Sequence, residues 1–455
     1  MISMSGLTGN SCKLLFAIVS LSLAVHSAEA ALDTLDSRII ADSEEPFSRR
    51  INSYDLGIDS SGDVHIIYSK PTGAETADII YQRRVSGIWQ SKQVLSPYGV
   101  GGSISTRLVI GDDDVVHVCY ILEKLNGQYT KGLYYRTLTG GTAGPEVMVG
   151  PGGWHSRMQL DGNAQPVFIR EDETWPGEVS KLAIFTTIDA STWDKTVLNV
   201  PDTVTGAKFR VAEFVYENGN YHVTYGDGSI TKPVLPGKEA TTRVDGIFHN
   251  LHYATSTDTQ NWTASVVDDS GTLYENEFWT SLTLDNSNPM IGMYKYAEYN
   301  DEFNTGTSAL LAEWNGTGWD SRIITVSSYP ETREGMGNDF VVRTPGNYLG
   351  AWDFSPDNTY DEHFRGERGN IALYRNGADD DWSERLQVDP FSAEGELKLV
   401  LHGDRLHLLV LGDFVDAKLY YREFDLNYID EQFELLSVRF PWEIFLPAIT
   451  QQSKM

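Results

Sequence analysis

The chain has 455 residues, with 64 Asp and Glu against 35 Lys and Arg, which gives a formal net charge of −29 at pH 7 and a pI near 4.6. This balance argues against duplex nucleic acid and anionic membranes as partners, because both are negatively charged. Only two cysteines are present, so a hydrophobic core rather than a disulfide framework must stabilise the fold.

The first thirty residues have the layout of a secretory signal. Lys13 precedes an apolar run from Leu14 to Val25, and a small-residue cleavage motif follows at 28–30. The apolar run is shorter than the about 20 residues that a membrane-spanning helix needs. We therefore expect a signal peptide at 1–30, no membrane span, and a secreted or periplasmic protein in which Cys119 is the remaining cysteine.

From residue 31 onward the chain repeats a unit of four short strands. A His often marks the second strand, aromatic residues mark the third, and a Trp opens the fourth. The third strand is found seven times, at Ile80-Tyr81, Tyr134-Tyr135, Ile184-Phe185, His252-Tyr253, Leu310-Leu311, Leu373-Tyr374 and Tyr420-Tyr421. These copies are about 47 to 68 residues apart, at or above the length of a propeller blade. The repeat predicts an all-β fold, a seven-bladed β-propeller with four-stranded blades over residues 31–424.

Several polar residues recur at fixed places in this unit. Because the second-strand histidines repeat, we interpret them as scaffold residues; they are His65, His117, His222 and His407. The first two strands are joined by acidic and Gly-rich turns, such as Asp59-Ser-Ser-Gly62, which suit tight hairpins. Acid clusters at 112–114 and 379–381 are interpreted as solvated turns, with calcium binding as the alternative. No other cofactor is expected.

The two ends of the chain fit a closed ring. The segment Leu35-Asp-Ser-Arg-Ile-Ile40 closely resembles the fourth strand Trp319-Asp-Ser-Arg-Ile-Ile324. We predict that it pairs as the outermost strand of the last blade, which removes an open sheet edge. Residues 425–455 are then a C-terminal tail, whose apolar segment 440–447 is expected to pack on the propeller or to dock a partner.

Two segments carry a resemblance to a known family. Thr187-Ile-Asp189-Ala-Ser-Thr-Trp193 and Ser256-Thr-Asp258-Thr-Gln-Asn-Trp262 resemble the box of the Asp-box or sialidase-like propellers, although each is one residue short of it and lacks its Gly. In that family the box is a structural turn away from the active site. The resemblance implies the architecture and not sialidase chemistry.

The long loops all join second to third strands and open onto one face, which is where function is expected on a propeller. Cations recur where the inner strands begin at that face, at Arg49, Arg50, Arg107, Arg157, Lys208, Arg210 and Lys398. They predict a positively charged channel mouth for an anionic ligand, lined by Arg107, His155, Arg157 and Arg210, of which at least two have no carboxylate partner. The alternative is that these cations pair with acids of neighbouring blades.

Aromatic residues such as Trp279 lie in or near the same loops and suit stacking on sugars. The expected function is therefore recognition of an anionic polysaccharide. By analogy with secreted propellers that are uronate polysaccharide lyases, His155, Arg157 and Tyr225 are candidate catalytic residues. The candidate ligand-binding residues are Arg107, Arg210, Trp279 and Lys398.

Whether the chain is an enzyme stays open at this point; if it is one, a polysaccharide lyase is expected. The alternative function is a non-enzymatic protein-interaction scaffold of an export or cell-envelope assembly, because propellers often bind proteins and the apolar tail would suit a protein partner. We expect a monomer.

Overall fold

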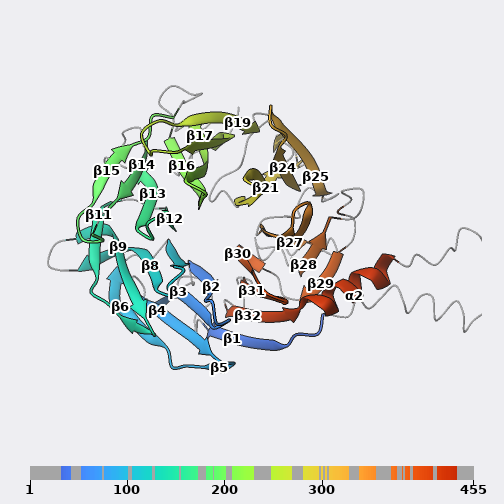
Figure 1. The fold of residues 1–455 in the computed structure, drawn as a ribbon, viewed down its shortest axis with the longest axis horizontal. Coiled ribbons are helices and arrows are strands. Elements are labelled where there is room, and N and C mark those ends of the chain that lie inside the picture. The colour runs from blue at the N-terminus through green and yellow to red at the C-terminus, as the bar shows by residue number, and fades with distance from the viewer. Residues whose placement is uncertain are drawn as a thin grey trace, which may run out of the picture.

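A computed structural model describes residues 32–42, 53–73, 76–100, 105–125, 129–152, 155–172, 181–187, 189–200, 208–229, 247–268, 280–296, 299–300, 303–304, 307–326, 338–354, 370–376, 382, 385–389, 393–412 and 418–437. The strands form seven antiparallel blades arranged in a ring (Figure 1). The predicted seven-bladed propeller is confirmed.

The first strand of each blade lies nearest the centre of the ring and the fourth lies at the rim (Figure 1). Blades 1 to 4 consist of β2 (Tyr54–Ile58), β3 (Val64–Gly73), β4 (Thr76–Val85) and β6 (Gln93–Val100); β7 (Thr106–Ile110), β8 (Val116–Leu125), β9 (Tyr129–Thr139) and β11 (Val147–Pro151); β12 (Ser156–Leu160), β13 (Pro166–Asp172), β14 (Lys181–Thr186) and β15 (Asp194–Val197); and β16 (Lys208–Glu217), β17 (Asn220–Ser229), β18 (Ile247–Ser256) and β19 (Thr263–Asp268).

Blades 5 to 7 consist of β20 (Thr280–Asp285), β21 (Asn288–Tyr296), β24 (Thr307–Trp314) and β25 (Trp319–Val326); β26 (Asn338–Thr344), β27 (Asn347–Phe354), β28 (Asn370–Arg375) and β29 (Arg385–Asp389); and β30 (Ala393–His402), β31 (Arg405–Gly412), β32 (Lys418–Asp425) and β1 (Asp36–Asp42). The short strands β5 (Ile88–Trp89) and β10 (Thr142–Ala143) pair with third strands, and β22 (Tyr299–Asn300) and β23 (Phe303–Asn304) form a small hairpin.

The N-terminal strand closes the ring as predicted. β1 pairs antiparallel with β32, with Ser37 opposite Arg422, and becomes the outermost strand of blade 7. Asp36 on this strand accepts a hydrogen bond from Arg84 of blade 1 at 2.7 Å, and Arg84 also pairs with Glu423 of blade 7. The seam between the last and first blades is therefore held by backbone pairing and by a charge network.

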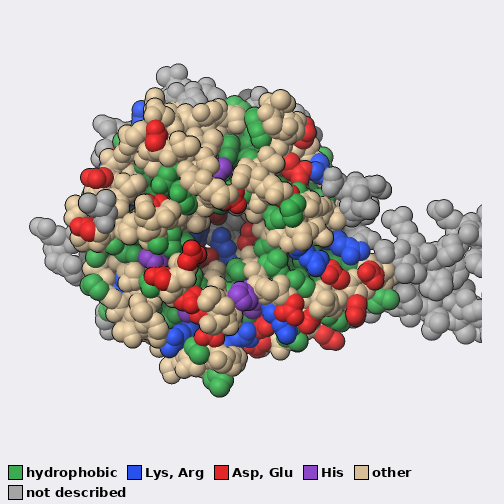
Figure 2. All heavy atoms as spheres, viewed as in Figure 1, with side chains coloured by type: hydrophobic (Ala, Val, Ile, Leu, Met, Phe, Trp, Pro, Cys, Tyr) green, Lys and Arg blue, Asp and Glu red, His purple; other side chains and the backbone are tan. Residues whose placement is uncertain are grey.

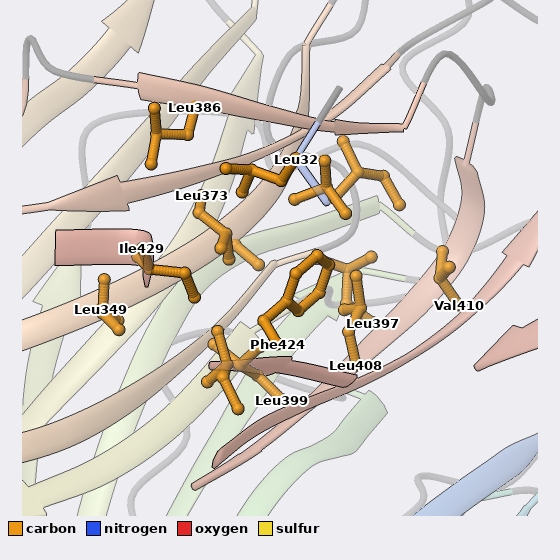
Figure 3. Packing of buried hydrophobic residues seen from close by; sticks show 14 of the residues in the cluster. Leu32, Leu349, Leu373, Leu386, Leu397, Leu399, Leu408, Val410, Phe424 and Ile429 are labelled. Atoms are coloured by element: carbon orange, nitrogen blue, oxygen red, sulfur yellow. The ribbon is translucent and has the colours of Figure 1, made fainter. Parts of the chain in front are cut away.

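The hydrophobic core is divided among the spaces between blades. The buried apolar residues of the described part of the chain form seven clusters, each shared by two adjacent blades. Figure 3 shows the cluster between blades 6 and 7, where Leu373 and Leu408 pack with Leu32 and Ile429 from the two ends of the chain. Because each blade packs against a neighbour on either side, its strands must present apolar residues on both faces.

The helix α2 (Leu426–Ser437), which directly follows β32, was not predicted. Asp425 caps it, because its Oδ1 accepts the backbone N–H of Asn427 at 2.9 Å. Arg343 of blade 6 holds Asp430 through two contacts of 2.6 and 2.8 Å. The apolar segment at 440–447 and the expected signal peptide at 1–30 lie outside the described residues.

In the part of the chain that the structure describes, no helix combines the length and the apolar character that crossing a membrane requires.

The recurring second-strand histidines form one repeated structural contact. Each is buried, and its Nδ1 lies 2.5 to 2.8 Å from a tyrosine hydroxyl on the third strand of the same blade; the pairs are His65–Tyr81, His117–Tyr135, His222–Tyr253 and His407–Tyr421. Burial lowers the pKa of all four histidines and raises the pKa of their tyrosine partners. Both groups therefore stay neutral at pH 7. In blade 1 the tyrosine donates to the histidine, because Nε2 of His65 lies 3.1 Å from Asp59 Oδ2 and so carries the ring proton. Their interpretation as scaffold residues agrees with this geometry.

The two segments that resemble the Asp box are turns between third and fourth strands. Asp189 Oδ1 accepts the backbone N–H groups of Ser191 and Thr192, both at 2.8 Å. Asp258 Oδ1 accepts those of Gln260 and Asn261 at 2.9 and 2.8 Å. These backbone hydrogen bonds lower the pKa of both aspartates to about 2. The segments thus act as structural turns, as the resemblance implied.

Candidate functional site

The centre of the ring holds a pocket of about 190 Å³. Six inner strands each contribute a charged residue to its lining: Asp55, Arg107, Arg157, Glu213, Asp339 and Lys398. We call these six residues the channel belt. Figure 2 shows the hollow at the centre of the ring, with basic and acidic side chains visible inside it.

The basic residues of the belt face carboxylates from other blades. Arg157 Nε lies 3.3 Å from Glu213 Oε1, and Lys398 Nζ lies 3.8 Å from Glu213 Oε2. The charge of Arg107 acts on Asp55. The expectation of cations without acidic partners is therefore wrong for Arg157, and pairing across blades, the alternative drawn from the sequence, describes it. The physical reason is that a buried guanidinium needs a counter-charge.

Two acids of the belt also connect neighbouring inner strands. Asp55 accepts the backbone N–H of Leu108 at 2.9 Å, and Asp339 accepts that of Leu399 at 2.8 Å. Each also accepts the N–H of the residue that follows it. Burial raises the pKa of Asp339 to about 6 and also raises the pKa of Asp55, while the charge of Lys398 opposes both shifts. These carboxylates therefore link blade 1 to blade 2 and blade 6 to blade 7.

His155 lies just before β12 and is held by a buried carboxylate of its own blade. Its Nδ1 is 3.2 Å from both side-chain oxygens of Glu171, and its backbone N–H donates to Glu171 Oε2 at 3.3 Å. Ser156 pairs with Arg170 across β12 and β13, so His155 and Glu171 are the next pair along the same ladder. Because side chains alternate along a strand, His155 is on the same sheet face as Arg157.

Glu171 was missed in the sequence because its position opposite His155 depends on strand register. The signal that could have found it is the pair Glu171-Asp172 at the end of an apolar second strand, where one of two successive acids must face the same side as His155.

The other predicted site residues are placed as follows. Tyr225 has no exposed surface and stacks on His252, with ring centroids 4.9 Å apart and an interplanar angle of 9°. His155 and Tyr225 do not line the belt pocket, whereas Arg107, Arg157 and Lys398 do. The backbone of Arg210 pairs with Gly226, but its side chain lies outside the described residues, as does Trp279.

The described residues contain no group of three or more His, Cys, Asp or Glu that could hold a metal ion. Asp114, from the acid cluster at 112–114, accepts the backbone N–H of Ser60 at 2.8 Å and its hydroxyl at 2.6 Å. The cluster at 379–381 lies outside the described residues. Calcium binding stays a prediction.

Comparison with known proteins shows the fold. No family model matches the sequence, and no curated protein matches it significantly. Two structures of the polysaccharide lyase PL25 ulvan lyase, one bound to -[GlcA(1-4)Rha3S]-, have TM-scores of 0.57 and 0.56 at 13% and 12% identity, over 85% of this chain and 96% of theirs. The NanB sialidase of Streptococcus pneumoniae is more distant, with a TM-score of 0.44 at 11% identity, over 89% of this chain and 72% of that one.

Proposed function

We propose that this chain is a carbohydrate-active propeller that recognises an anionic polysaccharide at the end of the channel where the inner strands begin. The observation that carries the proposal is the convergence of Arg107, Arg157 and Lys398, from three blades, in one pocket, with His155 on the same sheet face as Arg157. The shared fold supports it, because one of the ulvan lyases with this architecture is bound to a GlcA-containing oligosaccharide. Export, as expected from residues 1–30, would bring the protein to such polymers.

The arrangement also suits cleavage by a uronate lyase. Residues two apart on a strand are about 6–7 Å apart on one face, so Arg157 could meet the sugar carboxylate while His155 meets the adjacent C–H group. His155 Nε2 would take the C5 proton, the C4–O bond would break, and the C5 electron pair would form the C4=C5 double bond. The leaving oxygen would take a proton from water. The guanidinium would stabilise the charge that develops on the carboxylate.

A glycan array combined with ultraviolet detection of unsaturated uronate products tests both parts of this proposal. We expect binding of uronate polymers, and turnover that His155→Ala reduces roughly 100-fold or more with binding retained. Asp172→Asn is the matched control, because Asp172 follows Glu171 and pairs with Lys195 at 2.6 Å on the exposed side of the blade. Binding without turnover would leave a carbohydrate-binding protein.

The absence of both signals would refute the proposal. If a protein partner then co-purified in stoichiometric amount, the scaffold function would replace it. Tyr225 is not given a part in proton transfer, because a side chain with no exposed surface cannot reach a polymer.

A further inference from the structure

We propose that Glu171 is a positioning residue that holds His155 in its Nδ1–H form, so that the lone pair of Nε2 points away from Glu171 and can meet a ligand. The catalytic consequence of this inference rests on the proposed function. The tautomer itself does not, and it can be measured without any substrate.

The contacts leave one arrangement of protons on the ring. An ionised carboxylate only accepts hydrogen bonds, and a neutral imidazole has one donor and one acceptor nitrogen. Since Nδ1 lies 3.2 Å from both oxygens of Glu171, Nδ1 must be the donor. Nε2 is then the acceptor, the atom that a base uses to take a proton.

The burial of Glu171 makes this contact necessary for the carboxylate as well. Its side chain is only 5% exposed, against 13% for His155. A buried carboxylate requires hydrogen-bond donors, and His155 supplies two, its ring N–H and its backbone N–H. The backbone contact fixes where the carboxylate lies, and the carboxylate in turn fixes the ring.

His65, in the His–Tyr pair of blade 1, has the opposite arrangement. Its Nε2 lies 3.1 Å from a carboxylate oxygen of Asp59 and is therefore the donor, so its Nδ1, 2.6 Å from the Tyr81 hydroxyl, is the acceptor. His155 thus differs from His65 in the atom that carries its proton. The chain contains its own reference signal for a measurement of this difference.

Long-range ¹H–¹⁵N spectra of the ring nitrogens, recorded on the full chain at about pH 8, where histidine is neutral, test the inference. His155, assigned by its loss in His155→Gln, should show the Nδ1–H pattern, and His65 the Nε2–H pattern. Glu171→Leu should move His155 toward the Nε2–H pattern, whereas Asp172→Asn should not. An Nε2–H pattern for His155 in the unaltered chain, or no change in Glu171→Leu, would overturn the inference.

If a uronate polymer is cleaved, a double-mutant cycle adds a second test. Glu171→Leu should lower kcat about 10-fold or more with KM nearly unchanged, and should add nothing to His155→Ala. Additive losses would show that Glu171 does not act through His155 and would overturn the positioning role. Absence of turnover by the unaltered protein would refute the lyase function alone, because the tautomer measurement still decides whether Glu171 fixes the ring.

Discussion

Replacing His407 by Gln should remove part of the acid sensitivity of the fold. Burial, and after it the positive charge of Arg84, lower the pKa of His407 to about 3, whereas a histidine in an unfolded chain has a pKa of about 6.5. A group whose pKa is depressed on folding stabilises the protein above its unfolded pKa. That stabilisation is lost as the pH falls from about 6.5 toward 3.

The magnitude follows from the difference between these two pKa values. At pH 5 the unfolded chain binds almost one proton more at this position than the folded chain does, which corresponds to about 2 kcal/mol lost between pH 7 and pH 5. Asp339 acts in the opposite sense, because burial raises its pKa to about 6 and its protonation favours the folded state as the pH falls through 6. The effect of His407 must therefore be isolated by comparison with a variant.

Urea unfolding at pH 7 and pH 5, followed by tryptophan fluorescence, gives the required comparison. The unaltered protein should lose about 2 kcal/mol more stability over this interval than His407→Gln. An equal loss in the unaltered protein and in His407→Gln would refute the reasoning, since it would mean that His407 binds its proton equally well in both states.

Three further predictions concern the inner strands and the residues that pack against them. Gly292→Ala should destabilise the protein by about 1–3 kcal/mol in thermal unfolding, because a Cβ there would overlap the ring of Phe340 and lie 2.7 Å from the Ser281 hydroxyl. An unchanged midpoint of thermal unfolding would contradict this packing. Arg157→Glu should cost about 3–5 kcal/mol, and the exchange Arg157→Glu with Glu213→Arg should restore part of it; no recovery would count against their ion pair. Binding of an anionic polymer should strengthen from pH 7 to pH 5 as Asp339 becomes neutral. Titration calorimetry should find a smaller change of affinity with pH in Asp339→Asn. An identical change in both proteins would exclude Asp339 as its source.

The fold could be predicted from the sequence because a propeller repeats one local pattern. Second-strand histidines such as His65 and His117 and third-strand tyrosines such as Tyr81 recur at fixed spacing, and the structure shows that they contact each other within a blade. The helix α2 was missed because it is short and does not repeat. Its apolar residues Leu426, Ile429 and Phe433 do follow helical spacing.

The site was less predictable, because its contacts join residues that are far apart in the chain. The cations at the starts of the inner strands were identified, but their acidic partners occupy other blades, as Glu213 does for Arg157 and Lys398. A repeat pattern assigns a residue to a strand and does not tell which side chain it meets across the channel. The contact between His155 and Glu171 depends on register in the same way.

The three acids of the channel belt are held differently, and this difference bears on how an anionic ligand could enter. Asp55 and Asp339 each accept a backbone N–H from the next blade, so that displacing them would break a link between inner strands. The backbone N–H that Glu213 accepts is that of the following residue in its own strand, and its other contacts are with Arg157 and Lys398. A ligand carboxylate that reaches Arg157 therefore competes with Glu213 and leaves the links between blades intact. An anionic ligand that binds there would thus replace Glu213 as the counter-charge of the buried Arg157 guanidinium.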